Sequence, residues 1–412
     1  MKKIKLHWQI LIALVIAVLY GLYLTEYVDY ISWLGDLFLR ALQMVIVPLI
    51  LSSITSGVTN IGTGGNLGRL GFKTMLYYVS TSTFAILTGL LFVNIVQPGV
   101  GADLGFSQVV EGLDVARESF GETLLYIIPI NIFKAFTEGK MLSIIFFAIL
   151  FGFFITRVED KYRIFLTDFF NSAFEVMMKI TMFVIKFTPL GIFGIVARVV
   201  AEQAGDTAVL LDIFKRLGLY MLVVLFGLAV HGTITLPLII RYIAKVNPWK
   251  HFRAMTTPLL TAFSTSSSNA TLPLTMDAVQ NNSGVSIKIS SFTLPLGATV
   301  NMDGTALYEC VAAMFIAQAY GIELGFLQQA IVVVTALLAS IGAAGIPMAG
   351  LVMITIILSA VGLPLEGVGL ILAVDRILDM CRTTINVWSD SCGAVTIAKT
   401  EGETLKVELN KK

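Results

Sequence analysis

A line of charged and amide side chains follows one face of the last apolar segment of the chain, residues 374–390. Its members are spaced four, three, four and four residues apart: Asp375, Asp379, Arg382, Asn386 and Asp390. At about 100° per residue they fall within an arc of roughly 80° on one helix face, with Thr383 at its edge. A charge inside a membrane costs at least about 2.5 to 3.5 kcal/mol, so this face must line a polar interior.

The types of these side chains indicate what they could bind. Arg382 presents a planar fork that fits a carboxylate, and Asp379 could accept an ammonium group. Together they would bind a zwitterion that carries an additional carboxylate. Asp375 is one turn before Asp379 and is better placed to hold the guanidinium than to meet the ligand. The alternative is an internal ion pair that fixes helix packing, which stabilises poorly when buried and leaves Asn386 and Asp390 unexplained.

A second polar cluster interrupts the apolar sequence at Leu294–Thr305. A proline and two glycines weaken the helix on either side of Asn301 and Asp303. An unwound turn there would free carbonyl oxygens, which with Asp303 and Asp390 make hard oxygen sites of the kind that sodium requires. The alternative is a kink with a solvated aspartate.

Glu309 follows in the same apolar stretch. Desolvation favours the neutral form of a carboxyl group, so this side chain is a candidate proton carrier. An ordinary buried, hydrogen-bonded acid is the alternative.

The elements that must position these residues are membrane helices. The chain has 412 residues, of which 56% are hydrophobic and 13% charged, where an ordinary soluble chain carries about 25% charged residues. Its long apolar runs suit helices of roughly 20 residues or more. They are continuously apolar and lack the alternation of barrel strands. The sequence therefore predicts an all-α polytopic membrane protein.

Two apolar segments are interrupted differently from the others. Thr256–Ala298 contains a run of serine, threonine and asparagine, and Ala339–Gly350 contains small residues and a proline. Helix pairs that enter the membrane and turn back would produce this pattern, and such paired interruptions indicate a transporter's binding site. The alternative is two surface turns between ordinary spans.

Charge distribution and the remaining motifs limit the other classes. Basic residues near the amino terminus and in the loop that begins at Arg241 predict that both termini and this loop are cytoplasmic. The three cysteines lack C-x-x-C spacing, and no serine is set beside a histidine and an aspartate. An enzyme is therefore not expected.

Four motifs in order give the chain a close resemblance to a known family. They are Ser266–Pro273, Asn301–Thr305, Ala344–Pro347 and Asp375–Asp390. Over nearly its whole length the chain resembles the dicarboxylate/amino acid:cation symporters, which include animal glutamate transporters and archaeal aspartate transporters.

The resemblance implies eight transmembrane helices, two re-entrant hairpins at Ser266–Asn269 and Ala343–Gly350, inverted repeats, a homotrimer and an elevator-type mechanism. The implied divisions are 1–70 (scaffold helices 1 and 2), 71–98 (transport-domain helix 3), 99–216 (scaffold helices 4 and 5), 217–400 (helix 6, hairpin 1, helix 7, hairpin 2 and helix 8 of the transport domain) and 401–412 (cytoplasmic tail).

The resemblance also implies the site residues. In the substrate pocket Arg382 would bind the side-chain carboxylate and Asp379 the amino group, with the remaining positions Thr305, Thr383, Asn386, Ser268, Ile346 and Gly350. The three implied sodium sites comprise Asp390, Asn386, Gly297 and Asn301; Tyr78, Thr81, Ser82, Asn301 and Asp303; and Thr299, Ser340, Ile341 and Ala343.

Some positions depart from the family pattern. Glu309 is similar to the proton-carrying acid of animal members, where archaeal members have glutamine. Ser266 and Met380 stand where archaeal and animal members, respectively, place an arginine, and Arg376 is a candidate replacement. Trp388 and Ser389 replace small residues next to Asp390 and are expected to alter the ion site.

These features predict a symporter of the cell inner (plasma) membrane that takes up L-glutamate or L-aspartate with sodium and, as a further option, protons. Such a substrate carries one net negative charge, so at least two cations must accompany it for the membrane potential to favour uptake. A purely proton-coupled glutamate symporter or a C4-dicarboxylate symporter of the same fold is the alternative. An anion channel would leave the pocket residues without a purpose.

Overall fold

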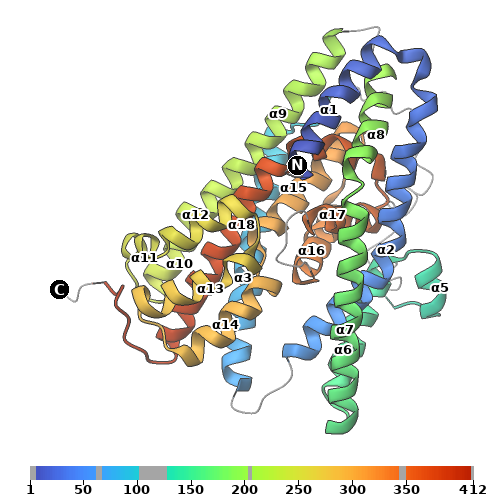
Figure 1. Cartoon of the computed structure of the whole chain (residues 1–412). Helices are drawn as coiled ribbons and strands as arrows, with labels where there is room; N and C mark the ends of the chain where they lie inside the picture. Colours follow the sequence, from blue (N-terminus) through green and yellow to red (C-terminus); the bar gives the residue numbers. More distant parts are fainter. Residues whose placement is uncertain (1–5, 62–66, 102–127, 203–206, 343–348, 410–412) are drawn as a thin grey trace, which may run out of the picture.

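A computed structural model describes residues 6–61, 67–101, 128–202, 207–342 and 349–409 (Figure 1). Helices dominate these ranges, which contain no strand and one isolated bridge, between Val246 and Glu408. The expectation of an all-α architecture is therefore confirmed for the described part of the chain. Large apolar side chains such as Phe84, Leu91 and Phe183 are exposed on helix surfaces, as in a protein surrounded by lipid.

A first group of helices forms around α2 (Asp29–Ile61). α2 packs against α6 (Met141–Ile155), α7 (Asp160–Ile185) and α8 (Thr188–Glu202), and α1 (Leu6–Tyr23) packs against α8. Glycines permit close approach here, because a Cβ on Gly194 would lie 2.5 Å from the backbone nitrogen of Gly35. Two short helices complete the group: η1 (Thr25–Tyr27) and α5 (Ile132–Thr137).

A second group forms around α15 (Asp303–Ala319), which is buried along almost its whole length. α15 packs against α3 (Leu67–Val96), α9 (Thr207–Val230) and α18 (Val368–Thr400). After α9 the chain continues through a π-helical turn, η3 (His231–Thr235), into α10 (Leu236–Tyr242) and α11 (Pro248–Ala254). Figure 1 shows α18 running beside α12, α13 and α14 in this group.

Both interrupted segments form pairs of packed helices. The first pair is α12 (Thr256–Thr265) and α13 (Ser268–Asp277), joined at Ser266, whose φ is +52°. A second π-helical turn, η4 (Ala278–Ser283), leads from this pair to α14 (Ile287–Val300). The second pair is α16 (Phe326–Gly342) and α17 (Ala349–Ala360), and its expected tip at 343–348 lies outside the described residues. A short 3₁₀ turn, η5 (Leu365–Gly367), then precedes α18.

Three helical stretches of the described ranges are long and apolar enough to cross a membrane: Asp29–Thr59, Arg69–Val96 and Leu211–Tyr242. A fourth is a pair, Asp160–Ile185 and Thr188–Ala201, bent by 50° at a short break. The chain is therefore a multi-pass membrane protein, and the count of eight spans stays a prediction.

Two of the expected domain boundaries do not coincide with the end of a helix. The boundaries after residues 70 and 216 fall inside α3 and α9, respectively. The described part of the expected tail, residues 401–409, lies against the second group: the amide of Asn247 donates to the carbonyl of Val407 at 2.8 Å, and the amide of Lys406 donates to that of Ser283 at 3.0 Å.

Candidate functional site

The polar face predicted at the end of the chain lies on α18 inside the protein. All six of its side chains are buried, with at most 6% of their surface exposed: Asp375, Asp379, Arg382, Thr383, Asn386 and Asp390. A helix that carries so many polar groups can be buried only where they pair with each other or with ligands.

Arg382 is held through one nitrogen of its guanidinium, Nη2. Its Nη2 donates to Oδ1 of Asp375 and to Oδ1 of Asp379, both at 3.0 Å. The guanidinium carbon lies 3.7 Å from the centre of the Tyr308 ring, and the Tyr308 hydroxyl donates to Oδ1 of Asp375 at 2.7 Å. Asp375 therefore holds the guanidinium, as its spacing predicts. Arg376 lies 3.7 Å from Oδ2 of Asp379.

The other two guanidinium nitrogens of Arg382 have no acceptor among the described residues. Its Nε and Nη1 are buried there without a hydrogen-bond acceptor. Nη1 faces Gly350 at the start of α17, where a Cβ would come within 2.9 Å of it. Because a buried donor without a partner is costly, Nη1 has the chemistry of a site for an incoming carboxylate.

The second polar cluster forms the predicted break. α14 ends at Val300 and α15 begins at Asp303, so the helical pattern is interrupted at Asn301 and Met302. Asn386 of α18 closes this break, because its Oδ1 accepts the Gly304 amide at 2.8 Å and its Nδ2 donates to the Thr305 hydroxyl at 3.1 Å.

Asp303 and Asp390 anchor a buried network of oxygen atoms. Oδ1 of Asp303 accepts the Ser82 hydroxyl at 2.6 Å, and Oδ2 accepts the Ser389 hydroxyl at 2.6 Å. Oδ1 of Asp390 accepts the Asn301 amide at 2.8 Å. In the described part of the chain neither aspartate has a lysine or arginine partner. Two buried carboxylates among hydroxyl and amide groups fit hard cations such as sodium.

The remaining implied ligands of these two cation positions are adjacent to the carboxylates. Thr81 Oγ1 lies 3.3 Å from Oδ1 of Asn301. A Cβ on Gly297 would come within 2.5 Å of Oδ1 of Asp390 and 2.8 Å of the Tyr78 hydroxyl. The Tyr78 hydroxyl itself donates to the carbonyl of Thr293 at 2.7 Å. Residues of α3, α14, α15 and α18 therefore meet at one place.

The comparison with protein families decides what class of protein holds this site. The model of the sodium:dicarboxylate symporter family matches residues 6–400. This chain belongs to that family. The resemblance read from its four motifs is thereby confirmed, and so is the expectation of a transporter rather than an enzyme.

Curated relatives of this symporter family match the chain over most of its length. The proton/glutamate-aspartate symporter of Escherichia coli K12 is 34% identical, over 97% of this chain and 94% of the relative. Human excitatory amino acid transporter 3 is 37% identical, over 90% and 79%, respectively. The proton/sodium-glutamate symport protein of Geobacillus stearothermophilus is 34% identical, over 98% and 96%.

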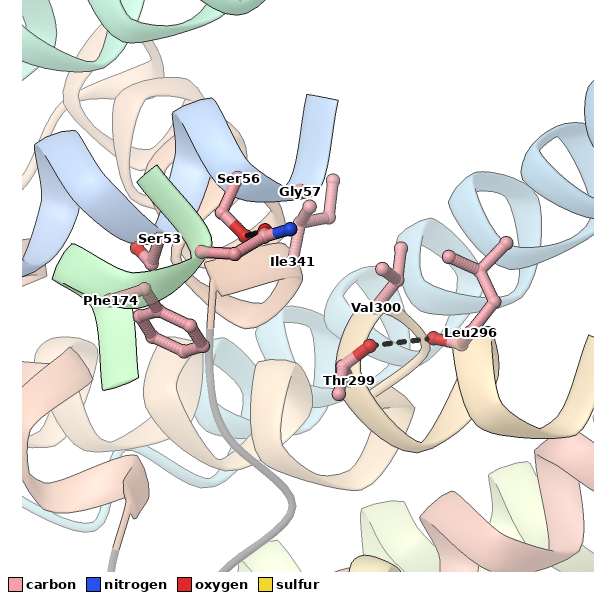
Figure 2. Close-up of a pocket in the computed structure, with 9 residues that line it drawn as sticks. Ser53, Ser56, Gly57, Phe174, Leu296, Thr299, Val300 and Ile341 are labelled. Atoms are coloured by element: carbon pink, nitrogen blue, oxygen red, sulfur yellow. Dashed lines mark hydrogen bonds between the residues drawn. The ribbon is translucent and has the colours of Figure 1, made fainter. Parts of the chain in front are cut away.

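The third implied sodium site lies beside a cavity in this symporter. Thr299 and Ile341 line a cavity of about 230 Å³ together with Ser53, Ser56 and Gly57 of α2 and residues of α7 (Figure 2). Ser340 is buried next to Ile341, whereas Ala343 and Ile346 lie outside the described residues. The cavity lies between α2 and α7 of the first group and α14 and α16.

The two remaining predicted site residues lie on different helices, Glu309 on α15 and Ser268 on α13. Both carboxyl oxygens of Glu309 are buried without a hydrogen-bond partner among the described residues. An ionised carboxylate in such a place is costly, so the site suits a proton carrier better than a fixed negative charge. Ser268 begins α13 at the tip of the first helix pair and is buried.

Sequence reasoning missed two members of the site. His231 lies in the π-helical turn η3, with Nε2 3.0 Å from Oδ2 of Asp303. Tyr308 lies under the Arg382 guanidinium. A histidine within an apolar span was the available signal for the first. Nothing in its spacing distinguished Tyr308 from a core aromatic residue.

Proposed function

We propose that this symporter takes up L-glutamate or L-aspartate together with sodium, and that a proton accompanies them. The half-satisfied guanidinium of Arg382 supports this most directly: Nη2 is fixed by Asp375 and Asp379, while Nε and Nη1 are buried and lack an acceptor among the described residues. A substrate carboxylate would accept hydrogen bonds from Nη1, the nitrogen that faces Gly350. The printed names of the relatives include glutamate and aspartate symporters.

The substrate's other groups have candidate partners around this arginine. Asp379, whose Oδ1 accepts from Arg382, would also accept the amino group. Thr305, Thr383 and Asn386 provide hydroxyl and amide groups on α15 and α18. Ser268, Ile346 and Gly350 would contribute backbone groups from the tips of the two helix pairs.

The proposed cations balance the buried carboxylates. Sodium would bind at Asp303 and at Asp390, which carry no compensating lysine or arginine in the described ranges. Glu309 would carry the proton. The relatives support both ions, since one is named a proton/sodium-glutamate symport protein.

We propose an elevator movement of the second group of helices against the first. The cavity between α2, α7, α14 and α16 supports such movement, because an interface that is not closely packed can slide. Within the proposed divisions, 1–70 and 99–216 form the scaffold, while 71–98 and 217–400 move. The homotrimer is carried from the resemblance, and the inner-membrane orientation with both termini cytoplasmic is carried from the distribution of basic residues.

The test is uptake of radiolabelled L-aspartate and L-glutamate into proteoliposomes, with inward sodium or proton gradients imposed separately. Native protein should accumulate both acids when sodium is imposed, and Arg382→Ala should abolish uptake. Arg241→Ala, which removes an exposed guanidinium on α10, is the matched control and should transport normally.

The same experiment separates the alternatives. Uptake driven only by protons would mean that transport is coupled to protons and not to sodium, an alternative that the buried Glu309 supports. Transport of succinate but of neither amino acid would replace the substrate assignment by a C4-dicarboxylate. Uptake that survives Arg382→Ala would refute the role of this guanidinium.

A further inference from the structure

The segment that follows α18, residues 401–409, binds two separate parts of the chain. We call this segment the strap. The amide of Lys406 donates to the carbonyl of Ser283 in η4 at 3.0 Å. The carbonyl of Val407 accepts the amide of Asn247, the residue that precedes α11, at 2.8 Å. The strap therefore connects the start of α11 with η4 through its backbone (Figure 1).

These two parts are the ends of the first helix pair. The chain enters α12 from α11, and it leaves α13 through η4, which leads to α14. The strap makes further contacts on the exit side. Nζ of Lys406 donates to the carbonyl of Asn281 at 2.8 Å, and the carboxylate of Glu403 accepts the amide and the hydroxyl of Ser286. One segment thus binds the chain on both sides of α12 and α13.

Two buried side chains anchor the strap. Leu405 and Val407 are 5% and 4% exposed, whereas Lys406 between them is exposed, so alternate side chains face the protein. Leu405 and Val407 belong to one apolar cluster with Met255, which joins α11 to α12, and with Val279 of η4. Burial of apolar surface is the main favourable term in such contacts, so these two side chains are expected to hold the strap in place.

The hydrogen bonds inside the first helix pair do not replace the strap. Four threonine hydroxyls each donate to the carbonyl four residues earlier: Thr261, Thr265, Thr271 and Thr275. Such bonds act within a helix and do not fix its direction. A hinge motion of a helix pair is absorbed by residues at the helix ends. Here His251 of α11 lies 2.9 Å from the Ser283 hydroxyl, and the strap binds at that same place.

We propose that the strap closes the base of the first helix pair and holds α12 and α13 as one body with α18. α12 packs against α18, and the strap follows α18 directly, so the pair is supported both from its side and from its base. The consequence for transport is that Ser268, at the tip of the pair, keeps its place relative to Arg382. Only this consequence rests on the function proposed above.

Hydrogen–deuterium exchange measures the effect of the strap without transport. Purified full-length protein in detergent is exchanged and analysed by mass spectrometry, and peptides from α12 and α13 are compared with peptides from α16 and α17. Leu405→Ser/Val407→Ser removes both apolar anchors. Leu405→Ala is a smaller change and carries the test if the double variant does not fold. Thr404→Ala is the matched control, because Thr404 is an exposed position of the strap.

We expect the amides of α12 and α13 to exchange about tenfold faster in the double variant, because protection follows the free energy of local opening. Leu405→Ala should give a smaller increase in the same helices, and Thr404→Ala should match native protein. α16 and α17 should keep their native exchange rates in all variants.

Unchanged exchange of α12 and α13 in both Leu405 variants overturns this inference. Equal acceleration in both helix pairs also overturns it, because the strap would then stabilise the protein as a whole. Neither result depends on sodium or on substrate, so a failure of the proposed transport function is distinguished from a failure of the strap.

Discussion

The guanidinium carbon of Arg382 lies 3.7 Å from the centre of the Tyr308 ring. The same tyrosine donates its hydroxyl to Asp375, which also accepts from Arg382. The three side chains therefore contact one another. The guanidinium of Arg382 lies on the face of the Tyr308 ring, and the hydroxyl of the same ring binds Asp375, the carboxylate that pairs with the guanidinium. This set fixes the direction of the free guanidinium nitrogens before a substrate arrives, which lowers the ordering cost of binding.

Removal of the Tyr308 hydroxyl tests this arrangement. Tyr308→Phe keeps the ring under Arg382 but takes a donor from Asp375, so the guanidinium should be less well oriented. We expect the half-saturating concentration of L-aspartate to rise about tenfold, the magnitude of a lost hydrogen bond to a charged group. Sodium-dependent uptake into proteoliposomes measures the change. Tyr242→Phe, at an exposed tyrosine on α10, should have no effect, and an unaltered Tyr308→Phe would refute the positioning role.

Glu309→Gln separates proton coupling from sodium coupling. Glutamine has nearly the same shape as glutamate but cannot bind or release a proton. In native protein both carboxyl oxygens of Glu309 lack hydrogen-bond partners among the described residues. We expect the variant to keep sodium-driven uptake and to lose the stimulation that an inward proton gradient gives native protein. A pH-sensitive dye inside the vesicles would record proton entry. Glu323→Gln, at an exposed position, is the control; persistent proton entry in Glu309→Gln would assign the proton elsewhere.

The sequence was most informative where membrane cost and helical spacing act together. The polar face of α18 and the break at Asn301 follow from local residue types, because charges and helix breakers are tolerated within an apolar run chiefly where they line a polar interior. The contact of Tyr308 with Arg382 and that of His231 with Asp303 could not be read in this way. Each joins different helices, and period alone says nothing about which faces of two helices meet.

The ends of the membrane helices were harder to predict from the sequence than their existence. Apolar runs predict that helices exist, yet α7 and α8 form one bent pair, and α3 and α9 continue through residues expected to be boundaries. Where a helix ends depends on caps and packing more than on hydropathy. The described tail, residues 401–409, also pairs with the body of the protein through contacts that its polar composition did not indicate.

One of these tail contacts supports the helix that leads to the cation positions. Ser286 precedes α14, and Glu403 accepts both its amide, at 3.0 Å, and its hydroxyl. Glu403→Ala should therefore lower the free energy of unfolding by about 1 kcal/mol. Thermal unfolding in detergent measures this loss. Glu175→Ala on the exposed face of α7 should change stability by less than about 0.5 kcal/mol, and equal effects of the two substitutions would contradict the support that Glu403 gives to α14.

His251 predicts how stability depends on pH. It is buried on α11, stacked on Trp388, with its ring nitrogens 2.9 Å from the Ser283 hydroxyl and 3.2 Å from that of Ser391. Burial lowers the pKa of His251 to about 3, from an ordinary value near 6.5. The unfolded chain therefore binds this proton more readily than the folded chain between these two values.

The stability that neutral His251 contributes is fully present above about pH 6.5 and is lost as the pH falls towards 3, by about 2 kcal/mol at pH 5. His251→Gln should be less stable than native protein at pH 7.5 but should lose less stability between pH 7.5 and pH 5. Thermal unfolding of both proteins at the two pH values measures how much stability each one loses. The other titrating groups are the same in both proteins, so their contributions cancel in the comparison. Parallel losses in the two proteins would mean that His251 is not the group that binds the proton.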